Sequence, residues 1–385
     1  MTDRPPHARP ANAHPANAHA PHARPPNADP ANARPLRAAL VGIGMVAPTH
    51  ARALRDADGV ELAAVCSRDP ERAAAFAAEA LRSGDASLAP AVAPGIDALA
   101  ADPAIDLVVL ATPPNARAEA VSRLAAAGKP ILMEKPVERT LHAARGLVEA
   151  CEAAGVPLGI VLQHRARPSA RTLRDLLAEG ALGTIAAIEV NVPWWRPQSY
   201  YDEPGRGSYA RDGGGVLISQ AIHAIDLALH LAAPSQGAVR SVTARLSRTG
   251  LHAMEAEDHA VIGLELEGGA VGSIVATTAA HPGGTEWIAL HGTRGSAVLR
   301  GDALTLDGHD GTHREIGEGG ATGGGADPMA FTHDWHRAVV EDFARVVRGG
   351  GEPIASGRDA LAVHRLIDAA TRASHEGRTI EPEDA

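Results

Sequence analysis

The sequence of 385 residues contains few aromatic residues, which make up 3% of it, and its only cysteines are Cys66 and Cys151. Two cysteines cannot form the disulfide framework of a small secreted domain, so a cytoplasmic location fits best. No apolar run reaches the roughly 18 residues that a transmembrane helix requires. The net charge of −10 argues against a general nucleic-acid-binding protein, which would neutralise phosphates with Lys and Arg.

Residues 1–35 form a low-complexity segment in which Pro-Ala-Asn-Ala recurs among scattered histidines. The segment lacks the apolar stretch of a secretory signal and is too polar to build a core, so we expect a disordered tail. Metal binding is an alternative role for these histidines, but their spacing is irregular.

From Leu36 onward, apolar segments with the pattern of strands alternate with amphipathic helical segments. The predicted strands are Ala38–Gly42, Glu61–Ser67, Leu107–Thr112, Ile131–Glu134 and Leu158–Gln163, and the helices are Pro48–Ala57, Pro70–Arg82, Ala116–Ala127 and Leu141–Ala154. This alternation is typical of a parallel sheet with helices on both faces. Residues 36–165 are therefore predicted to form an α/β doubly wound, dinucleotide-binding Rossmann domain.

The turn after the first strand has the pattern Gly-x-Gly-x-x-Ala between Gly42 and Ala47. Gly42 permits a tight turn, Gly44 lets the backbone approach a pyrophosphate, and Ala47 lets the next helix pack closely. We expect this turn, including Met45 and Val46, to bind the cofactor. A tight turn that binds no ligand is the alternative reading of the motif alone.

The second strand ends at Ser67 and Arg68, where an acidic residue would bind the ribose 2′-hydroxyl of NAD. Asp69 is better explained as the N-cap of the next helix. A hydroxyl and a guanidinium suit a 2′-phosphate, so NADP is favoured over NAD. The alternative is that Arg68 is an ordinary solvated side chain.

The next two strands end in Thr112-Pro113-Pro114-Asn115 and Glu134-Lys135-Pro136. Both ends lie at the carboxyl edge of a parallel sheet, where ligands bind in this architecture. Thr112, Pro113, Asn115, Glu134 and Lys135 are therefore expected to contact the cofactor. Lys135 is also a candidate catalytic residue, although a lone lysine at a strand end can be a simple surface charge.

In this order the motifs resemble those of the glucose–fructose oxidoreductase / inositol dehydrogenase / rhizopine-catabolism (Gfo/Idh/MocA) oxidoreductases. Later stretches that share the resemblance are Glu179–Gly183, Gly213–Leu217 and Ser374–Arg378. The resemblance implies NAD(P)-dependent oxidation or reduction of a sugar, cyclitol or sugar derivative. It also implies a second α/β domain, residues 166–385, which has a large, mostly antiparallel sheet and forms a homodimer or homotetramer.

The second half independently supports this architecture, because its apolar segments are longer and alternate with polar residues. The predicted strands are Ala186–Val192, Val239–Ser247, His259–Glu267, Val271–Thr278 and Ile288–Gly292. Glu267-Gly268-Gly269 is expected to join two of them in a hairpin. Two further helices are predicted, at Asp334–Arg348 and Arg358–His375.

A helix is predicted over Val216–Leu231, with Ser219, His223, Asp226 and His230 on one face. The preceding Gly213–Gly215 would allow the backbone to approach a ligand closely. The resemblance places His223 and Lys135 beside the reacting carbon. A histidine with a pKa near neutrality can take the alcohol proton, and the lysine can stabilise the negative charge on oxygen. Without the resemblance, a buried structural histidine is the simpler interpretation.

One position departs from the family pattern. Many members carry an aspartate one helical turn before the histidine, where this chain has Ser219 followed by Gln220. A serine cannot stabilise an imidazolium as a carboxylate can. Either His223 and Lys135 act without that carboxylate or another residue replaces it.

The loop before this helix carries half of the aromatic residues of the chain. We expect Trp194, Trp195, Arg196 and Tyr209 to bind the substrate, together with Arg165, Ser219 and Gln220. Arg165, Arg167, Arg196, Arg206 and Arg211 could hold a carboxylate or phosphate, as in a uronate or a nucleotide-linked sugar. Packing at an interface is the alternative for the aromatic residues, and surface ion pairs are the alternative for the arginines.

These features favour an NAD(P)-dependent oxidoreductase that transfers hydride between nicotinamide and a hydroxyl or carbonyl carbon of a sugar-like substrate. A redox-neutral glycosidase or epimerase with tightly bound NAD is one alternative, and a non-catalytic, dinucleotide-bound sensor is another. No metal is expected, because outside the tail the histidines lack the spacing of metal ligands with Cys, Asp or Glu.

Overall fold

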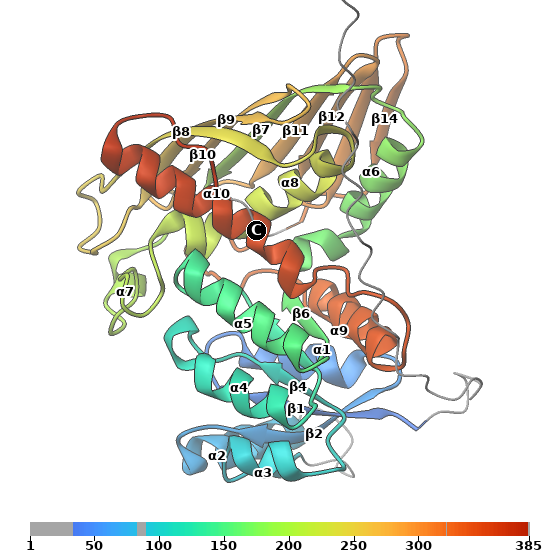
Figure 1. The fold of residues 1–385 in the computed structure, drawn as a ribbon, viewed down its shortest axis with the longest axis vertical. Coiled ribbons are helices and arrows are strands. Elements are labelled where there is room, and N and C mark those ends of the chain that lie inside the picture. Colours follow the sequence, from blue (N-terminus) through green and yellow to red (C-terminus); the bar gives the residue numbers. More distant parts are fainter. Residues whose placement is uncertain (1–33, 83–89, 321, 384–385) are drawn as a thin grey trace, which may run out of the picture. The chain divides into compact units, whose positions relative to one another are not determined.

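A computed structural model of the chain describes residues 34–82, 90–320 and 322–383. The predicted tail, with its histidines, lies almost entirely outside these residues. The described residues from Pro35 onward form one compact unit that contains a six-stranded and an eight-stranded sheet (Figure 1). The boundary at residue 165 stays a prediction.

The six-stranded sheet is entirely parallel, with the order β3-β2-β1-β4-β5-β6. Its strands are β1 (Leu36–Val41), β2 (Val60–Cys66), β3 (Ala91–Val92), β4 (Leu107–Leu110), β5 (Ile131–Glu134) and β6 (Leu158–Val161). The connecting helices are α1 (Ala47–Asp56), α2 (Pro70–Arg82), α3 (Ile96–Ala101), α4 (Ala118–Ala126) and α5 (Leu141–Ala153). This strand order confirms the doubly wound prediction.

Three short elements of this half departed from the sequence prediction. Strand β3 and helix α3 were not predicted, because two and six residues are too few to show a hydrophobic period. The helix predicted over Ala116–Ala127 is split into the 3₁₀ turn Pro114–Ala116 and α4. The break falls at Arg117, whose side chain is fully buried.

Helices from the C-terminal end of the chain complete the first sheet. Helix α9 (Asp334–Val347) packs beside α1, and α10 (Gly357–Glu376) packs beside α5 (Figure 1). Phe343 of α9 lies so close to β6 that a Cβ atom at Gly159 would be 2.7 Å from its ring. The core on this face therefore depends on residues far apart in the sequence.

The eight-stranded sheet has the order β14-β13-β12-β11-β7-β10-β9-β8. Its strands are β7 (Ile185–Pro193), β8 (Val239–Ser247), β9 (His259–Leu266), β10 (Val271–Thr277), β11 (Trp287–Gly292), β12 (Gly295–Arg300), β13 (Ala303–Gly308) and β14 (His313–Ile316). All neighbours pair antiparallel except β7 and β10. The mostly antiparallel prediction and the hairpin at Glu267–Gly269 are confirmed, whereas β12–β14 were not predicted.

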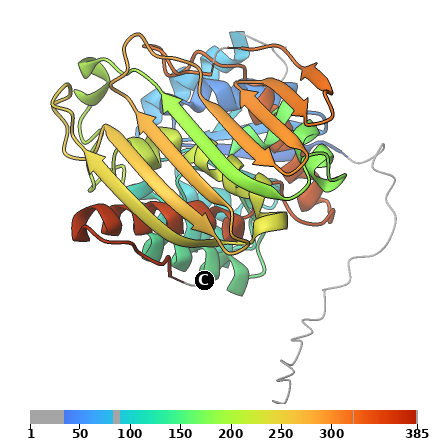
Figure 2. The same cartoon turned by 90° about the horizontal axis from the view of Figure 1, so that it is seen from above.

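Helices cover one face of this sheet. They are α6 (Pro168–Ala178), which was not predicted, α8 (Ile222–Gln236) and α10. Figure 2 shows the opposite face of the sheet, which no described helix crosses. The segment Leu217–Gln236 is long and apolar enough to span a membrane, but 72% of its most apolar window is buried inside the protein, as in a core helix.

Candidate active site

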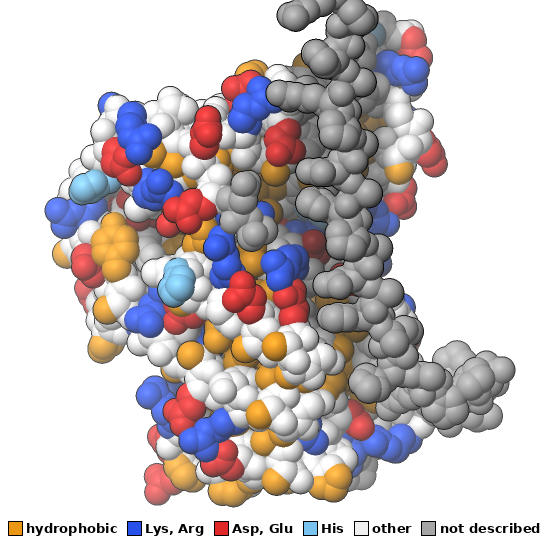
Figure 3. All heavy atoms as spheres, viewed as in Figure 1, with side chains coloured by type: hydrophobic (Ala, Val, Ile, Leu, Met, Phe, Trp, Pro, Cys, Tyr) orange, Lys and Arg blue, Asp and Glu red, His pale blue; other side chains and the backbone are white. Residues whose placement is uncertain are grey.

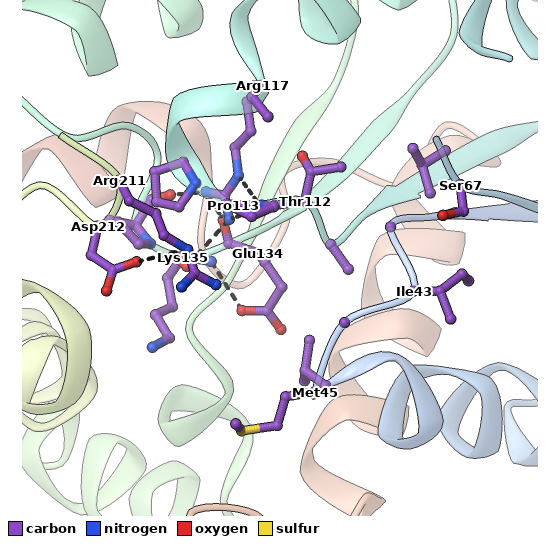
Figure 4. Close-up of a pocket in the computed structure, with 18 of the residues that line it drawn as sticks. Ile43, Met45, Ser67, Thr112, Pro113, Arg117, Glu134, Lys135, Arg211 and Asp212 are labelled. Carbon is purple, nitrogen blue, oxygen red and sulfur yellow. Dashed lines mark hydrogen bonds and ion pairs between the residues drawn. The ribbon is translucent and has the colours of Figure 1, made fainter. Parts of the chain in front are cut away.

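A cavity of about 1100 Å³ runs along the carboxyl edge of the parallel sheet toward α8. Figure 4 shows its middle part, with Ile43, Met45 and Ser67 on one side and Arg211 and Asp212 on the other. Glu134 and Lys135 lie between these two sides. Its lining includes residues 42–46, 66–68, 112–114, 134–136, 163, 164, 219, 220 and 223.

The glycine-rich turn has the geometry that a dinucleotide site requires. Gly42 has φ +97°, and a Cβ atom there would be 2.8 Å from the carbonyl carbon of Ala111, so only glycine fits. A Cβ at Gly44 would meet no protein atom within 4 Å, which leaves room for a phosphate. Ala47 is buried at the start of α1 and does not line the cavity, so its role is helix packing.

The end of β2 presents a positive rather than an acidic group to the cavity. Ser67 and Arg68 both line it. Asp69 instead accepts hydrogen bonds at 3.1 Å from the backbone N–H groups of Glu71 and Arg72, as expected for an N-cap. Arg72, which the sequence analysis did not select, adds a second guanidinium to the lining.

Buried Arg117 joins the ends of β4 and β5. Its guanidinium donates to the carbonyl oxygen of Thr112 at 2.8 and 2.9 Å and also to the carbonyl oxygens of Glu134 and Pro136. Burial lowers the pKa of Arg117 to about 10, so the side chain stays charged at neutral pH. Arg117 was not predicted as a site residue, because an arginine near a helix start is usually solvated.

Around Arg117, most of the predicted cofactor residues lie where the sequence placed them. Thr112, Pro113 and Glu134 line the cavity. Asn115 lies in the 3₁₀ turn Pro114–Ala116, where it is exposed and outside the lining. We therefore withdraw Asn115 from the predicted cofactor contacts.

Two buried histidines flank the Glu134 carboxylate. His50 Nε2 lies 2.8 Å and His336 Nε2 lies 3.8 Å from Glu134 Oε1, and the ligand atoms of all three residues lie within 4.8 Å of one another. Both Nδ1 atoms lack a hydrogen-bond partner among the described residues, whereas metal-binding histidines usually donate through their second nitrogen. We therefore interpret this set as hydrogen bonding around Glu134.

This environment fixes the charge of Glu134. Burial opposes its ionisation, but the hydrogen bond from His50 and the nearby positive charges lower its pKa to about 2. Burial lowers the pKa of His336 to about 3, so that ring is neutral near pH 7. Glu134 therefore presents a carboxylate to the cavity.

Lys135 and the segment before α8 meet at the centre of the cavity. Lys135 Nζ donates to the backbone oxygen of Ser219 at 2.7 Å, and burial lowers its pKa to about 8. The segment Leu217–Ala221 is a π-helical turn rather than the start of a regular α-helix. Such turns are frequent at functional sites, and here Ser219, Gln220 and His223 all line the cavity.

His223 is buried and neutral. Burial, followed by the charge of Lys135, lowers the pKa of its imidazole well below the ordinary value. Its Nδ1 atom has no hydrogen-bond partner among the described residues. The ring of His164, which the sequence analysis did not select, lies 4.9 Å from the His223 ring. The two catalytic candidates are thus brought to one cavity.

The predicted substrate loop is divided between the cavity and the core. Trp194, Arg196 and Tyr200 line the cavity, and Gln220 Nε2 donates to the Tyr200 hydroxyl at 3.2 Å. Trp195 turns instead toward His252 and His281, with ring centroids 5.7 and 5.1 Å away. Tyr209 is 48% exposed and lies outside the lining. Trp195 and Tyr209 therefore do not line the cavity, unlike the other residues predicted in this loop.

Arg165 is also removed from the predicted substrate contacts. Its guanidinium forms two hydrogen bonds of 2.7 Å with the buried carboxylate of Asp226, and it does not line the cavity. The bidentate pair fixes η3 (Gln163–Ala166) against α8. The sequence did not reveal this partner, because Asp226 lies on α8, far from Arg165 in the chain.

The expected role of the triple glycine was also wrong. A Cβ atom at Gly215 would be 1.8 Å from the backbone oxygen of Glu257, and one at Gly213 would be 2.6 Å from Arg139 Cα. The Glu257 carboxylate also accepts from the N–H groups of Gly215 and Leu217. The glycines thus allow close packing of the protein on itself rather than on a ligand.

A parallel sheet with a glycine-rich turn at its carboxyl edge, and a cavity that contains Lys135 and His223, define a dinucleotide-dependent enzyme. Residues 36–161 match the model of the oxidoreductase family with an NAD-binding Rossmann fold, and residues 170–298 match the GFO/IDH/MocA C-terminal domain. The chain belongs to the GFO/IDH/MocA family of oxidoreductases, as the sequence resemblance predicted.

Individual relatives agree with this assignment. The chain is 30% identical to D-apiose dehydrogenase of Paraburkholderia graminis over 90% of this chain and 89% of the relative. It is 25% identical to inositol 2-dehydrogenase of Rhizobium meliloti over 90% of this chain and 98% of the relative. The WlbA dehydrogenase of Bordetella pertussis, solved with NADH and UDP-GlcNAcA, is 28% identical and superposes with a TM-score of 0.74. That comparison covers 91% of this chain and 99% of WlbA.

The buried Arg165–Asp226 pair predicts a structural rather than a substrate-binding role for Arg165. Arg165→Met should lower the free energy of unfolding by about 3–5 kcal/mol, because it leaves the Asp226 charge buried without its partner. Urea denaturation would measure this loss. The double variant Arg165→Met/Asp226→Leu should be more stable than Arg165→Met. A stable Arg165→Met protein with a selectively raised KM for substrate would contradict this assignment.

Proposed function

We propose that the protein is an NAD(P)-dependent dehydrogenase or reductase that acts on a CH–OH group of a sugar, cyclitol or sugar derivative. The observation that carries this proposal is the position of Lys135 and His223 in one cavity with the Gly42–Val46 turn. The dehydrogenases named above support the substrate class.

The residues fit a dinucleotide. Gly44 leaves open space, and the N–H groups of Met45 and Val46 donate to no acceptor in the described part of the chain, so they are available for a phosphate. The Glu134 carboxylate can accept hydrogen bonds from ribose hydroxyls. When bound, the nicotinamide accepts a hydride from the alcohol carbon or returns one to the carbonyl carbon.

The protein supplies the proton chemistry of this reaction. In the oxidation direction, the Lys135 ammonium holds the substrate oxygen and stabilises its developing negative charge. The neutral imidazole of His223 accepts the hydroxyl proton as the carbon–hydrogen bond breaks. The C–OH group would become C=O, with the hydride taken up by a bound nicotinamide, and the proton on His223 would then pass to solvent.

Ser219 fits this division of roles without an aspartate. Its backbone oxygen, rather than its side chain, accepts the hydrogen bond from Lys135 Nζ. A carbonyl positions the ammonium without neutralising it, so the charge remains available for the substrate. We therefore propose that Lys135 and His223 form the acid–base set by themselves.

Removing either catalytic side chain should abolish most of the activity. Lys135→Met and His223→Ala should each lower kcat by about 10²- to 10⁴-fold, the range typical for a lost general base or charge-stabilising donor. Absorbance of the reduced nicotinamide, followed with a panel of sugars and both cofactors, measures this rate. His230→Asn, a histidine variant on the same helix but outside the cavity, is the control.

Cofactor affinity, measured by fluorescence titration, should be nearly unchanged in Lys135→Met and His223→Ala. Unchanged turnover in both variants would remove the catalytic assignment. Bond cleavage or epimerisation without a steady change in absorbance would favour the redox-neutral enzyme, and binding without turnover would favour the sensor.

The Lys135 pKa of about 8 predicts the pH dependence of sugar oxidation. The active form carries a protonated Lys135 and a neutral His223, so kcat/KM should be flat near neutrality and fall above about pH 8. In Lys135→Arg the alkaline fall should move to higher pH, because guanidinium keeps its proton there. A wild-type rate that rises through pH 8–10 would identify Lys135 as the base instead.

We further propose that NADP is preferred over NAD. Ser67 and Arg68 at the end of β2 support this proposal, because they can bind a 2′-phosphate. Asp69, the nearest acid in sequence, is engaged as a helix cap. The WlbA structure contains NADH, so this relative does not support a preference for NADP. The proposal depends on the residues of this chain alone.

Arg68→Ala should lower kcat/KM for NADP by about tenfold or more, as expected for the loss of a charge-assisted hydrogen bond, while the value for NAD changes little. Arg52→Ala removes an exposed arginine of α1 that does not line the cavity and should change neither value. Equal effects of Arg68→Ala on both cofactors would contradict the NADP preference.

The proposed assembly is a homodimer or homotetramer. The helix-free face of the second sheet (Figure 2) carries Val261, 46% exposed, and Val271, 56% exposed, which supports it as the contact surface.

Acidic and basic side chains are mixed on the face shown in Figure 3. This mixture and the net charge of −10 support a cytoplasmic protein that binds neither nucleic acid nor a membrane.

A further inference from the structure

The substrate end of the cavity carries more positive than negative side chains. Around Tyr200 and Lys135, its lining contains the four cations Lys135, Arg196, Arg206 and Arg211 and the three anions Glu134, Glu203 and Asp212. The positive charge of Arg206 is one cause of the lowered pKa of Lys135, after burial and the opposing effect of Glu134. These charges therefore act on the same space as the proposed catalytic groups.

The partners of the arginines show which charge is available. Arg165 and Arg167 are each bound to a buried carboxylate, that of Asp226 and Glu286 respectively. Arg206 and Arg211 share Glu203, at 2.9 and 2.7 Å. Of the five arginines that the sequence singled out, Arg196 alone has no carboxylate within 4.0 Å among the described residues.

Arg196 is nevertheless 2% exposed. Its Nη1 donates to the backbone oxygens of Trp195 and Gly325, at 2.8 and 2.6 Å, while Nε is buried without a partner and no bond from Nη2 to a described residue exists. Nε is enclosed by protein, so Nη2 is the donor of Arg196 that remains for a group bound in the cavity. A buried cation without a carboxylate partner is costly unless an anion binds it.

The surroundings of Arg196 belong to the substrate end. Its guanidinium carbon lies 5.7 Å from the ring centroid of Tyr200 and 5.2 Å from that of Trp194, and Arg206 lies over Tyr200 at 4.8 Å. The Tyr200 hydroxyl accepts a hydrogen bond from Gln220. Gln220 directly follows Ser219, whose backbone oxygen accepts the hydrogen bond from Lys135. An anionic group at Arg196 would therefore belong to the molecule held at Lys135 and His223.

We propose, building on the proposed function, that the substrate is a sugar acid whose carboxylate binds Nη2 of Arg196, with Arg206 as a second positive neighbour. A carboxylate accepts a charge-assisted hydrogen bond from a guanidinium donor. A sugar phosphate shares this anionic chemistry and is the comparison in the test. Arg196 thereby determines specificity, whereas Lys135 and His223 carry the reaction.

The test compares matched substrates on the full-length enzyme with NADP and with NAD. D-glucuronate, D-glucose and D-glucose 6-phosphate form one set, and D-galacturonate and D-galactose form another. We expect kcat/KM for an acid to exceed that for its neutral partner by about tenfold or more, as one charge-assisted contact provides. A higher value for the neutral sugar overturns the proposal, and a preference for the phosphate overturns the assignment to a carboxylate.

Arg196→Gln should remove most of the acid preference, mainly through a rise in KM of about 10- to 100-fold. Arg211→Gln is the matched control and should reduce the preference less, because Glu203 already binds that guanidinium. Thermal unfolding and cofactor titration verify that both variants are folded. An acid preference that survives in folded Arg196→Gln also overturns the proposal.

Calorimetric binding of D-glucuronate and D-glucose to the cofactor-loaded enzyme separates this proposal from the proposed function. If the acid binds more tightly than the neutral sugar but no sugar is oxidised, the specificity proposal holds and the dehydrogenase proposal fails. If sugars are oxidised but the acid binds no better, the dehydrogenase proposal holds and the specificity proposal fails.

Discussion

The hydrogen bond from Lys135 Nζ to the Ser219 backbone oxygen is the contact on which the active-site arrangement depends. It joins the carboxyl end of β5 to the π-helical turn before α8, and so connects the parallel sheet to the second half of the chain. A carboxylate at this position would pair with the ammonium and raise its pKa. The carbonyl fixes the same atom while burial keeps the pKa near 8, so Lys135 is both positioned and available.

A cation held by backbone carbonyl oxygens also explains the interrupted helix after β4. Arg117 takes its acceptors from the carbonyl oxygens at the ends of β4 and β5. For its guanidinium to reach them, Arg117 must lie at the sheet edge between the 3₁₀ turn and α4. A regular helix that began at Ala116 would not bring the guanidinium to these oxygens. The break in the helix therefore depends on the positions of the Thr112 and Glu134 carbonyl groups.

Much of the fold could be predicted because its signals are local. The alternation of apolar strands and helices identified five of the six parallel strands, and the chain order placed Thr112, Glu134 and Lys135 at one sheet edge. The two-residue strand β3 carries too little pattern. Strands β12 and β13 alternate in burial over only six residues each, and small or polar residues weaken that signal in the sequence.

The site was less predictable because its decisive contacts connect distant residues. Arg165 and Arg196 look alike in the sequence, since both are near predicted substrate elements. They differ in their partners. The Asp226 carboxylate binds Arg165, whereas backbone oxygens hold Arg196. Likewise, nothing local to Gly213–Gly215 shows that Glu257 packs against it. Residue type gave the possible chemistry, and tertiary pairing decided which residues could use it.

Four buried cations of this protein, Arg165, Arg167, Lys135 and Arg196, therefore form two pairs with different consequences. Where a carboxylate is the partner, as for Arg165 and Arg167, the charge is neutralised and the contact fixes secondary structure elements. Where carbonyl oxygens are the partners, as for Lys135 and Arg196, the side chain is held but its charge still extends into the cavity. Because the cavity wall is low in dielectric, such charges act strongly on a bound molecule. In these four residues the same kind of positive side chain thus serves either rigidity or an electropositive site, and the acceptor distinguishes the two pairs.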